Sequence, residues 1–273
     1  MHKMSLASLL PAGIDYTELK QQENRRSSLA FLNGTLIQNS SSSSGGIMSR
    51  TFTGGVWGLA SSADMSSPGM EKVIRKAVAN ARLLSHSVNK GKILLPSNPA
   101  VGEYLFFSKK PAWSTAQRID FIKVIDDYVA RTYPELSTRQ IALNQDEMEK
   151  NILTSDGGSL HSMTPRSILV IYLMTTHNGE AIQNYDVFGG IGQSEDVFDD
   201  PSVYFPEVDR IYKELQDKKD AVFARGGTFD VVLDAKLAGI LSHEAIGHTT
   251  EADFVLNGSI AGDYLNQPVA SEM

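Results

Sequence analysis

The chain has 273 residues and a formal net charge of -7, with 41% hydrophobic and 21% charged residues. These proportions are typical of a globular protein with enough residues for one large domain or two smaller ones. The negative charge argues against a nucleic-acid-binding protein, and the lack of cysteine excludes disulfides, thiolate metal ligands and a cysteine nucleophile within these residues.

The sequence also argues against a membrane protein. No stretch approaches the roughly 20 apolar residues of a membrane span. The short apolar run near the N-terminus is interrupted by Pro11, which is unlike a signal peptide. We therefore expect a cytoplasmic protein with no membrane partner.

Strands and turns are predicted for the first part of the chain. Asn33-Gly34 stands between two apolar runs, which is a strong hairpin signal because both turn positions favour a positive φ. Residues 40–46, SSSSSGG, are predicted to be a flexible hairpin loop because strand-like segments lie close on either side. Gly54-Gly55 predicts the next hairpin, between IMSRTF and VWGLASS.

Two helices are predicted next. The first begins near Ser66, which can cap it, and Pro68 suits its first turn. Its apolar residues recur at intervals of three and four, as on one face of a helix. The second opens at Ser114 and runs through STAQRIDFIKVIDDYVART. We expect both helices to cover one face of the first sheet.

Beyond Pro134 the pattern returns to strands. LSTRQIAL, KNILTS, SILVIYLMTTH and EAIQNYDVFGG are each predicted to be a strand, with turns at 156–158 and 178–179. A third helix is predicted over 206–219. A further strand, TFDVVL, is expected before a last helix that Asp234 caps.

The predicted fold class is α+β, with antiparallel sheets and packed helices. An N-terminal α/β domain, residues 1–135, is expected to precede an incomplete, mostly-β domain, residues 136–273. The second domain carries the last helix, in which the candidate site lies.

The candidate site is the pattern His-Glu-x-x-x-His, formed by His243, Glu244 and His248. It is one residue longer than the His-Glu-x-x-His of the zincins. On a regular helix, residues four apart differ by about 40° around the axis and residues five apart by about 140°, so a straight α-helix cannot direct both imidazoles to one metal. Either a wide turn that closes i to i+5, or a helix that bends or ends at Gly247, would bring them together.

Glu244 stands where zincins hold the carboxylate that takes a proton from water. A catalytic zinc usually has three protein ligands, and Glu251, Asp253 and Glu272 are candidates for the third. Glu251 or Asp253 can instead orient an imidazole through a hydrogen bond. The alternative is that both histidines are ordinary core or surface residues, since a motif this short also occurs by chance.

A family resemblance favours the metal site. The segment VVLDAKLAGILSHEAIGHTTEADFVLNGSIAGDYLNQPVASEM closely resembles the motif region of the TldD/PmbA family of metallopeptidases. The segment ENRRSSLAFLNGTLIQNSSSSSGGIMSRTFTGGVWGLASS is similar to the first strands of that family. The resemblance implies that His243 and His248 are metal ligands, that Glu244 is the general base, and that the metal is zinc.

The resemblance also implies a function. It indicates a peptidase subunit that cleaves extended or unfolded peptides, including precursors that mature into modified peptides such as microcins. Subunits of this kind pair with a PmbA/TldE-like partner or form homodimers. The alternative function is a non-catalytic dimerisation or scaffold subunit of the same family.

The chain departs from the family pattern in its ligand set. The third metal ligand of the family is a cysteine in a C-terminal region, and this sequence has no cysteine. The resemblance therefore implies an N-terminal fragment that lacks the C-terminal region, binds metal weakly and is inactive alone.

Other features of the sequence do not indicate a second functional site. GGIGQSED, residues 189–196, lacks the end of a P-loop, which argues against a nucleotide-dependent regulator. His161 and His177 are expected in solvent-facing loops. No Gly-x-Ser-x-Gly elbow supports a serine hydrolase.

Overall fold

The computed structural model describes residues 6, 10–86, 95, 97–256 and 258–268. The chain divides into two compact units, Met1–Ala221 and Val222–Met273. Among the described residues, no helix combines the length and the apolar character needed to cross a bilayer.

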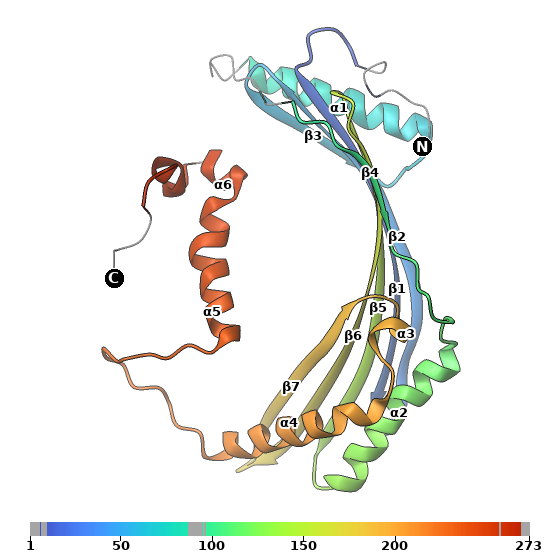
Figure 1. Cartoon of the computed structure of the whole chain (residues 1–273), viewed down its shortest axis with the longest axis vertical. Helices are drawn as coiled ribbons and strands as arrows, with labels where there is room; N and C mark the ends of the chain where they lie inside the picture. The colour runs from blue at the N-terminus through green and yellow to red at the C-terminus, as the bar shows by residue number, and fades with distance from the viewer. Residues whose placement is uncertain (1–5, 7–9, 87–94, 96, 257, 269–273) are drawn as a thin grey trace. The chain divides into compact units, whose positions relative to one another are not determined.

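The first unit is built on one seven-stranded sheet (Figure 1). Its strands are β1 Tyr16–Leu32, β2 Thr35–Thr53, β3 Val56–Ser62, β4 Val101–Leu105, β5 Thr138–Thr154, β6 Ser159–His177 and β7 Glu180–Ile191. They follow the order β3-β2-β1-β5-β6-β4, and β7 pairs with the C-terminal half of β6. β4 is parallel to β6, and the other described pairs are antiparallel. The predicted α+β class is therefore confirmed.

The sheet contains strands from both sides of residue 135. β1 pairs with β5 from Glu18 opposite Thr154 to Leu32 opposite Gln140. The division into domains 1–135 and 136–273 stays a prediction.

The predicted hairpins are confirmed by their backbone angles. Asn33 and Gly34, between β1 and β2, have φ of 49° and 82°. Gly54 and Gly55, between β2 and β3, have φ of 59° and 80°. Glycine and asparagine tolerate this left-handed region, which explains why these dipeptides predict the turns correctly.

The prediction of a hairpin loop over residues 40–46 is wrong. This run belongs to β2, where Ser40 lies opposite Ser28 and Gly46 lies opposite Gln22. Serine composition suggests flexibility, but small polar side chains do not prevent an extended strand whose backbone groups pair with a neighbour. For the same reason the two strands predicted from LSTRQIAL and KNILTS are one continuous strand, β5, because the polar residues between them stay paired on both sides.

The three helices that the sequence predicts for the first unit begin close to their expected positions, and the structure adds one short helix that is not predicted. They are α1 Ser67–Ser85, α2 Thr115–Thr132, α3 Ser194–Val197 and α4 Phe205–Asp217, with short 3₁₀ turns at Pro201–Tyr204 and Lys218–Asp220. The Ser66 side chain accepts a hydrogen bond from the N–H of Gly69 and caps α1. Ser114 caps α2 in a reciprocal capping box with Gln117.

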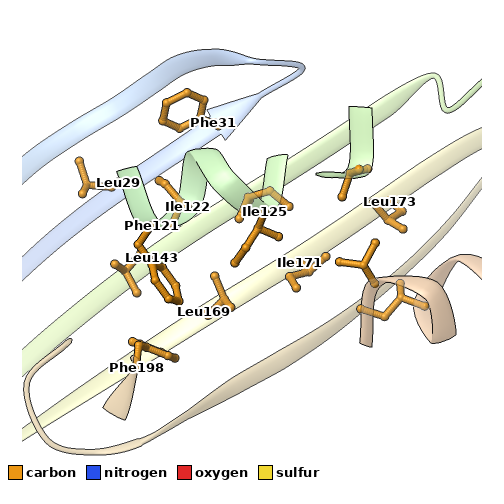
Figure 2. Packing of buried hydrophobic residues seen from close by; sticks show 14 of the residues in the cluster. Leu29, Phe31, Phe121, Ile122, Ile125, Leu143, Leu169, Ile171, Leu173 and Phe198 are labelled. Carbon is orange, nitrogen blue, oxygen red and sulfur yellow. The ribbon is translucent and has the colours of Figure 1, made fainter. Parts of the chain in front are cut away.

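Both α1 and α2 cover the same face of the sheet, as expected. Odd-numbered residues of β1, β5 and β6 point to this face: Leu19 packs with α1, whereas Leu29 and Leu143 pack with α2 and α4. Figure 1 shows α1 at one end of the long strands and α2 with α4 at the other. Figure 2 shows the side chains of α2 packed over those of β1, β5 and β6. Even-numbered residues of β1, β5 and β6 form the opposite side, which carries none of the described helices of the first unit; we call it the open face.

A group of tyrosines joins α2 to α4. Tyr128 and Tyr133 each donate a hydrogen bond to Asp209 Oδ1, at 2.8 and 2.7 Å. The ring of Tyr133 also stacks on that of Tyr212, with centroids 3.8 Å apart. Burial and the hydrogen bond to Asp209 raise the pKa of Tyr128 and of Tyr133 above the ordinary value of 10.0.

These raised pKa values predict a loss of stability at alkaline pH. The tyrosines contribute stability fully below their unfolded pKa, and that contribution is lost as the pH rises through the folded pKa, because the unfolded chain ionises first. We expect urea unfolding to give a smaller free energy above about pH 10 than at about pH 8, and the variant Tyr133→Phe to lose part of this dependence. The same alkaline slope in the variant and the parent would contradict this role for Tyr133.

The second unit consists of short helices. They are α5 Ala235–Ser242, a π-helical turn at His243–Gly247, a 3₁₀ turn at His248–Thr250, α6 Ala252–Leu256 and a 3₁₀ turn at Ile260–Tyr264. Asp234 caps α5 as predicted, because its Oδ1 accepts from the N–H of Leu237 at 2.7 Å. The strand predicted for TFDVVL, residues 228–233, is wrong: among the described residues this segment has no strand partner. An apolar segment forms a strand only where a neighbour takes its backbone hydrogen bonds.

Candidate metal centre

The motif residues lie where the helix changes type. α5 ends at Ser242, and His243–Gly247 form a π-helical turn. The N–H of His248 donates to the carbonyl of His243, five residues earlier. This is the wide turn that the spacing allows. The alternative, a bend or end at Gly247, is wrong because Gly247 keeps a helical φ of -54° and ψ of -59°.

The wide turn brings the two imidazoles to the same side of the helix. Their ring centroids are 4.5 Å apart and their planes meet at 69°. One ligand atom each from His243, Glu244 and His248 lies within 4.8 Å of the other two. Two nitrogens that share a zinc at about 2.1 Å must come within about 4 Å of each other. Small rotations of these exposed side chains therefore suffice for both imidazoles to reach one metal ion.

Glu251 orients one of the imidazoles. Its Oε1 lies 2.7 Å from His248 Nδ1, which fits a hydrogen bond that leaves Nε2 of the same ring available. Glu244 Oε2 lies 3.8 Å from that Nε2. The hydrogen bond between Glu251 and His248 fits the role that the sequence allows for Glu251, which is to orient an imidazole. The side chain of Asp253 and the whole of Glu272, the other two candidates, lie outside the described residues.

Local hydrogen bonds hold the end of the motif helix. The hydroxyls of Thr249 and Thr250 each donate to the carbonyl of Ile246, at 3.0 and 2.8 Å. Ser259 Oγ donates to the carbonyl of Thr249 at 2.7 Å, which ties the following segment back to the helix. These bonds occupy carbonyls that a helix end otherwise leaves unpaired.

The prediction that His161 lies in a solvent-facing loop is wrong. His161 lies in β6, its side chain is 29% exposed, and its Nε2 is 2.9 Å from Glu149 Oε1. Hydrogen bonds from His161 and from Arg25 lower the pKa of Glu149. In the part of the chain that the structure describes, the group of three potential ligands close enough to share a metal is the one formed by the motif.

Comparisons with known proteins bear on the family and the fold of the chain. The family model described as PmbA/TldA metallopeptidase domain 1 matches residues 17–81. Over 269 residues the chain is 25% identical to a metalloprotease of Methanocaldococcus jannaschii, and the match covers 98% of this chain and 58% of that relative. Residues 17–81 thus resemble the first domain of the PmbA/TldA metallopeptidases, and the chain is similar to metalloproteases over almost its whole length.

Two other comparisons concern a zinc metalloprotease and the fold. A zinc metalloprotease TldD homologue of Saccharolobus solfataricus is 25% identical over 145 residues, which are 53% of this chain and 32% of that relative. A solved structure from Bacteroides thetaiotaomicron, named as a candidate modulator of DNA gyrase, matches with a TM-score of 0.72 at 14% identity. That match covers 98% of this chain and 60% of the other, and at this identity it shows the fold alone. The chain thus spans less than two thirds of the length of relatives that it matches almost throughout.

Proposed function

We propose that this chain is a zinc-dependent peptidase subunit of the TldD type that acts on extended or unfolded peptides, including the maturation of peptide precursors. The observation that carries the proposal is the π-helical turn that gathers His243, Glu244 and His248. The zinc metalloprotease from Saccharolobus solfataricus supports zinc as the metal. The activity of a whole TldD-type protein remains part of the proposal, because the chain matches 58% of the Methanocaldococcus jannaschii relative.

In this proposal each motif residue has a distinct role. His243 and His248 would hold zinc through ring nitrogens, with Glu251 fixing the second ring. When bound, zinc would supply Lewis-acid activation of a water molecule and of the peptide carbonyl. Glu244 takes a proton from the water that attacks the carbonyl carbon, and returns it to the amine that leaves when the C–N bond breaks.

Two histidines leave the ligand set incomplete, because a catalytic zinc usually has three protein ligands. The family pattern supplies a cysteine, and this chain contains none. We therefore assign the third ligand to residues outside these 273. The chain by itself is expected to bind zinc weakly and to be inactive.

Hydrolysis is best tested in a fusion of this chain with the portion of the Methanocaldococcus jannaschii relative that it does not match. The fusion should cleave an unfolded peptide in a chelator-sensitive way. Glu244→Gln should lower the rate by about a hundredfold or more, since general base catalysis contributes roughly 10²–10⁴, and it should leave the zinc content unchanged. Rate and zinc content are measured together, with Glu71→Gln on α1 as a matched surface control. Full activity in Glu244→Gln would remove this residue as the base.

The competing proposal is a non-catalytic dimerisation or scaffold subunit. Zinc analysis separates the two, because a TldD-type subunit should hold about one zinc per chain in the fusion and a scaffold should hold none. A PmbA/TldE-like partner or a homodimer belongs to the same proposal and is tested by the mass of the assembly in solution. The cytoplasmic location stays a prediction.

A further inference from the structure

The middle of the open face carries three cations without a partner. Lys20 on β1, Lys150 on β5 and Arg166 on β6 have even numbers and therefore share this face. In the part of the chain that the structure describes, the side chains of these three residues make no hydrogen bond or ion pair with another protein group. Two acids share this face: Asp146 lies 3.5 Å from Arg26, and Glu18, two residues from Lys20, lies 2.9 Å from Arg50.

The opposite side of the same strand segments has the opposite charge. Glu23, Glu147 and Glu149 gather there around Arg25. The chain as a whole carries a net charge of -7. The two sides of this part of the sheet therefore carry opposite charge. The positive charge of the open face is local, since the chain as a whole is negatively charged.

The basic face is also hollowed. Gly46 and Ser44 of β2 lie opposite Gln22 and Asn24, and these small residues leave a hollow of about 570 Å³ that Lys20 also lines. A second hollow of about 90 Å³ lies between β5 and β6, and it is lined by Lys150, Ser162, Thr164 and Arg166, together with Met148 and Asp146. Gln22 lies opposite Lys150, so the two hollows are neighbours on one face.

The lining of these hollows combines cations with hydroxyl and amide groups. Such groups bind carboxylates and peptide backbone, since both accept hydrogen bonds and carboxylates also attract the cations. Aromatic platforms, on which nucleic-acid bases stack, are absent from the described lining. The chemistry therefore favours an acidic peptide over a nucleic acid.

The spacing of the cations matches an extended chain. Lys20 lies opposite Ile152, two residues along β5 from Lys150, and Arg166 lies opposite Asp146, four residues beyond Lys150 in the same direction. At about 3.4 Å per residue these steps are about 7 and 14 Å along the strands. Side chains on one side of an extended peptide recur about every 7 Å, so acidic residues at its first, third and seventh positions would reach the three cations.

We propose that the basic centre of the open face, defined by Lys20, Lys150 and Arg166, is a docking site for an extended acidic peptide segment. The inference rests on the proposed function only in choosing a peptide as the ligand. The docking site has different residues from the metal centre, and peptide binding there needs no metal. Asp146, which lies opposite Arg166, weakens the attraction and limits binding to segments with several acidic groups.

The probe is a fluorescent heptapeptide with glutamate at its first, third and seventh positions and serine or threonine elsewhere, titrated with the whole chain by anisotropy. EDTA is present throughout, so that the result does not depend on the metal centre and failure of either proposal is seen separately. The double variant Lys150→Gln with Arg166→Gln should weaken binding about fivefold or more, since each exposed ion pair contributes up to about fivefold in affinity. Lys72→Gln with Lys76→Gln on α1 removes the same charge elsewhere and should change the affinity less than about twofold.

A variant that is expected to bind the peptide more tightly shows that weaker binding in the other variants is not caused by misfolding. Asp146→Asn removes the acid from the smaller hollow and should strengthen binding about twofold or more. A peptide with glutamine in place of glutamate should bind more weakly, as should one with glutamate at its first three positions. Equal affinity for the glutamine peptide, an unchanged affinity in the Lys150 and Arg166 double variant, or tighter binding of a poly-dT oligonucleotide or of heparin overturns the proposal.

Discussion

His248→Ala is expected to lower the zinc affinity of the chain by about a hundredfold or more. Structural zinc sites bind with roughly 10–16 kcal/mol over four ligands, so one ligand contributes about 3 kcal/mol, or about a hundredfold in the dissociation constant. The physical reason is the π-helical turn, which places the imidazoles of His243 and His248 with centroids 4.5 Å apart. Calorimetric titration with zinc at about pH 7.5 measures the change.

Two further variants test whether the loss of zinc affinity is specific to the motif. His177→Ala removes an imidazole outside the motif, at the end of β6, and should leave the zinc affinity unchanged. Glu251→Gln keeps both ligands but weakens the hydrogen bond to His248 Nδ1, and it should cost about tenfold, as supporting groups of metal ligands do. If the parent chain bound zinc no better than the double variant His243→Ala with His248→Ala, the metal centre would be excluded and the scaffold alternative favoured.

The sequence predicts correctly those features that depend on the backbone or side chain of one residue and its near neighbours. Asn33-Gly34 marks a turn because its own backbone tolerates a positive φ. Ser114 and Asp234 mark helix starts because their side chains bond to amides in the first turn. The π-helical turn is one of the two local geometries that the five-residue spacing of the histidines allows if they are to share a metal, and the spacing alone does not choose between that turn and a bend at Gly247.

The wrong predictions concern features that depend on a distant partner. Residues 40–46 are a strand because β1 lies beside them, whereas residues 228–233 have strand-like composition but no strand partner among the described residues. Neither neighbour can be read from the segment itself. The pair of His161 with Glu149 arises from the register of β5 against β6, where Asn151 lies opposite His161, and no local pattern indicates it.

The hairpin between β1 and β2 is attached to α2 through a buried ion pair. Arg139 Nε on β5 lies 2.9 Å from Asp126 Oδ1 on α2, and the Asp126 side chain is 1% exposed. The backbone of Arg139 also bonds with Asn33: its N–H donates to Asn33 Oδ1 at 2.9 Å, and its carbonyl accepts from the Asn33 N–H at 3.0 Å. Arg139 therefore connects β5, α2 and the first turn.

Arg139→Ala is expected to lower the free energy of unfolding by about 3–5 kcal/mol, because removing one partner leaves the Asp126 carboxylate buried without a compensating charge. This loss is a large part of the free energy of unfolding of a typical domain, which is roughly 5–15 kcal/mol. Urea unfolding followed by circular dichroism measures the loss. Arg75→Ala, which removes an exposed ion pair with Glu71 on α1, is the control and should cost no more than about 0.5 kcal/mol. The double variant Asp126→Leu with Arg139→Met should recover most of the loss, since apolar replacement of a buried pair is often neutral. If Arg139→Ala cost no more than Arg75→Ala, Asp126 would be hydrated in solution, and the turn would be held to β5 by the bonds between Asn33 and the backbone of Arg139 and not to α2 by the ion pair.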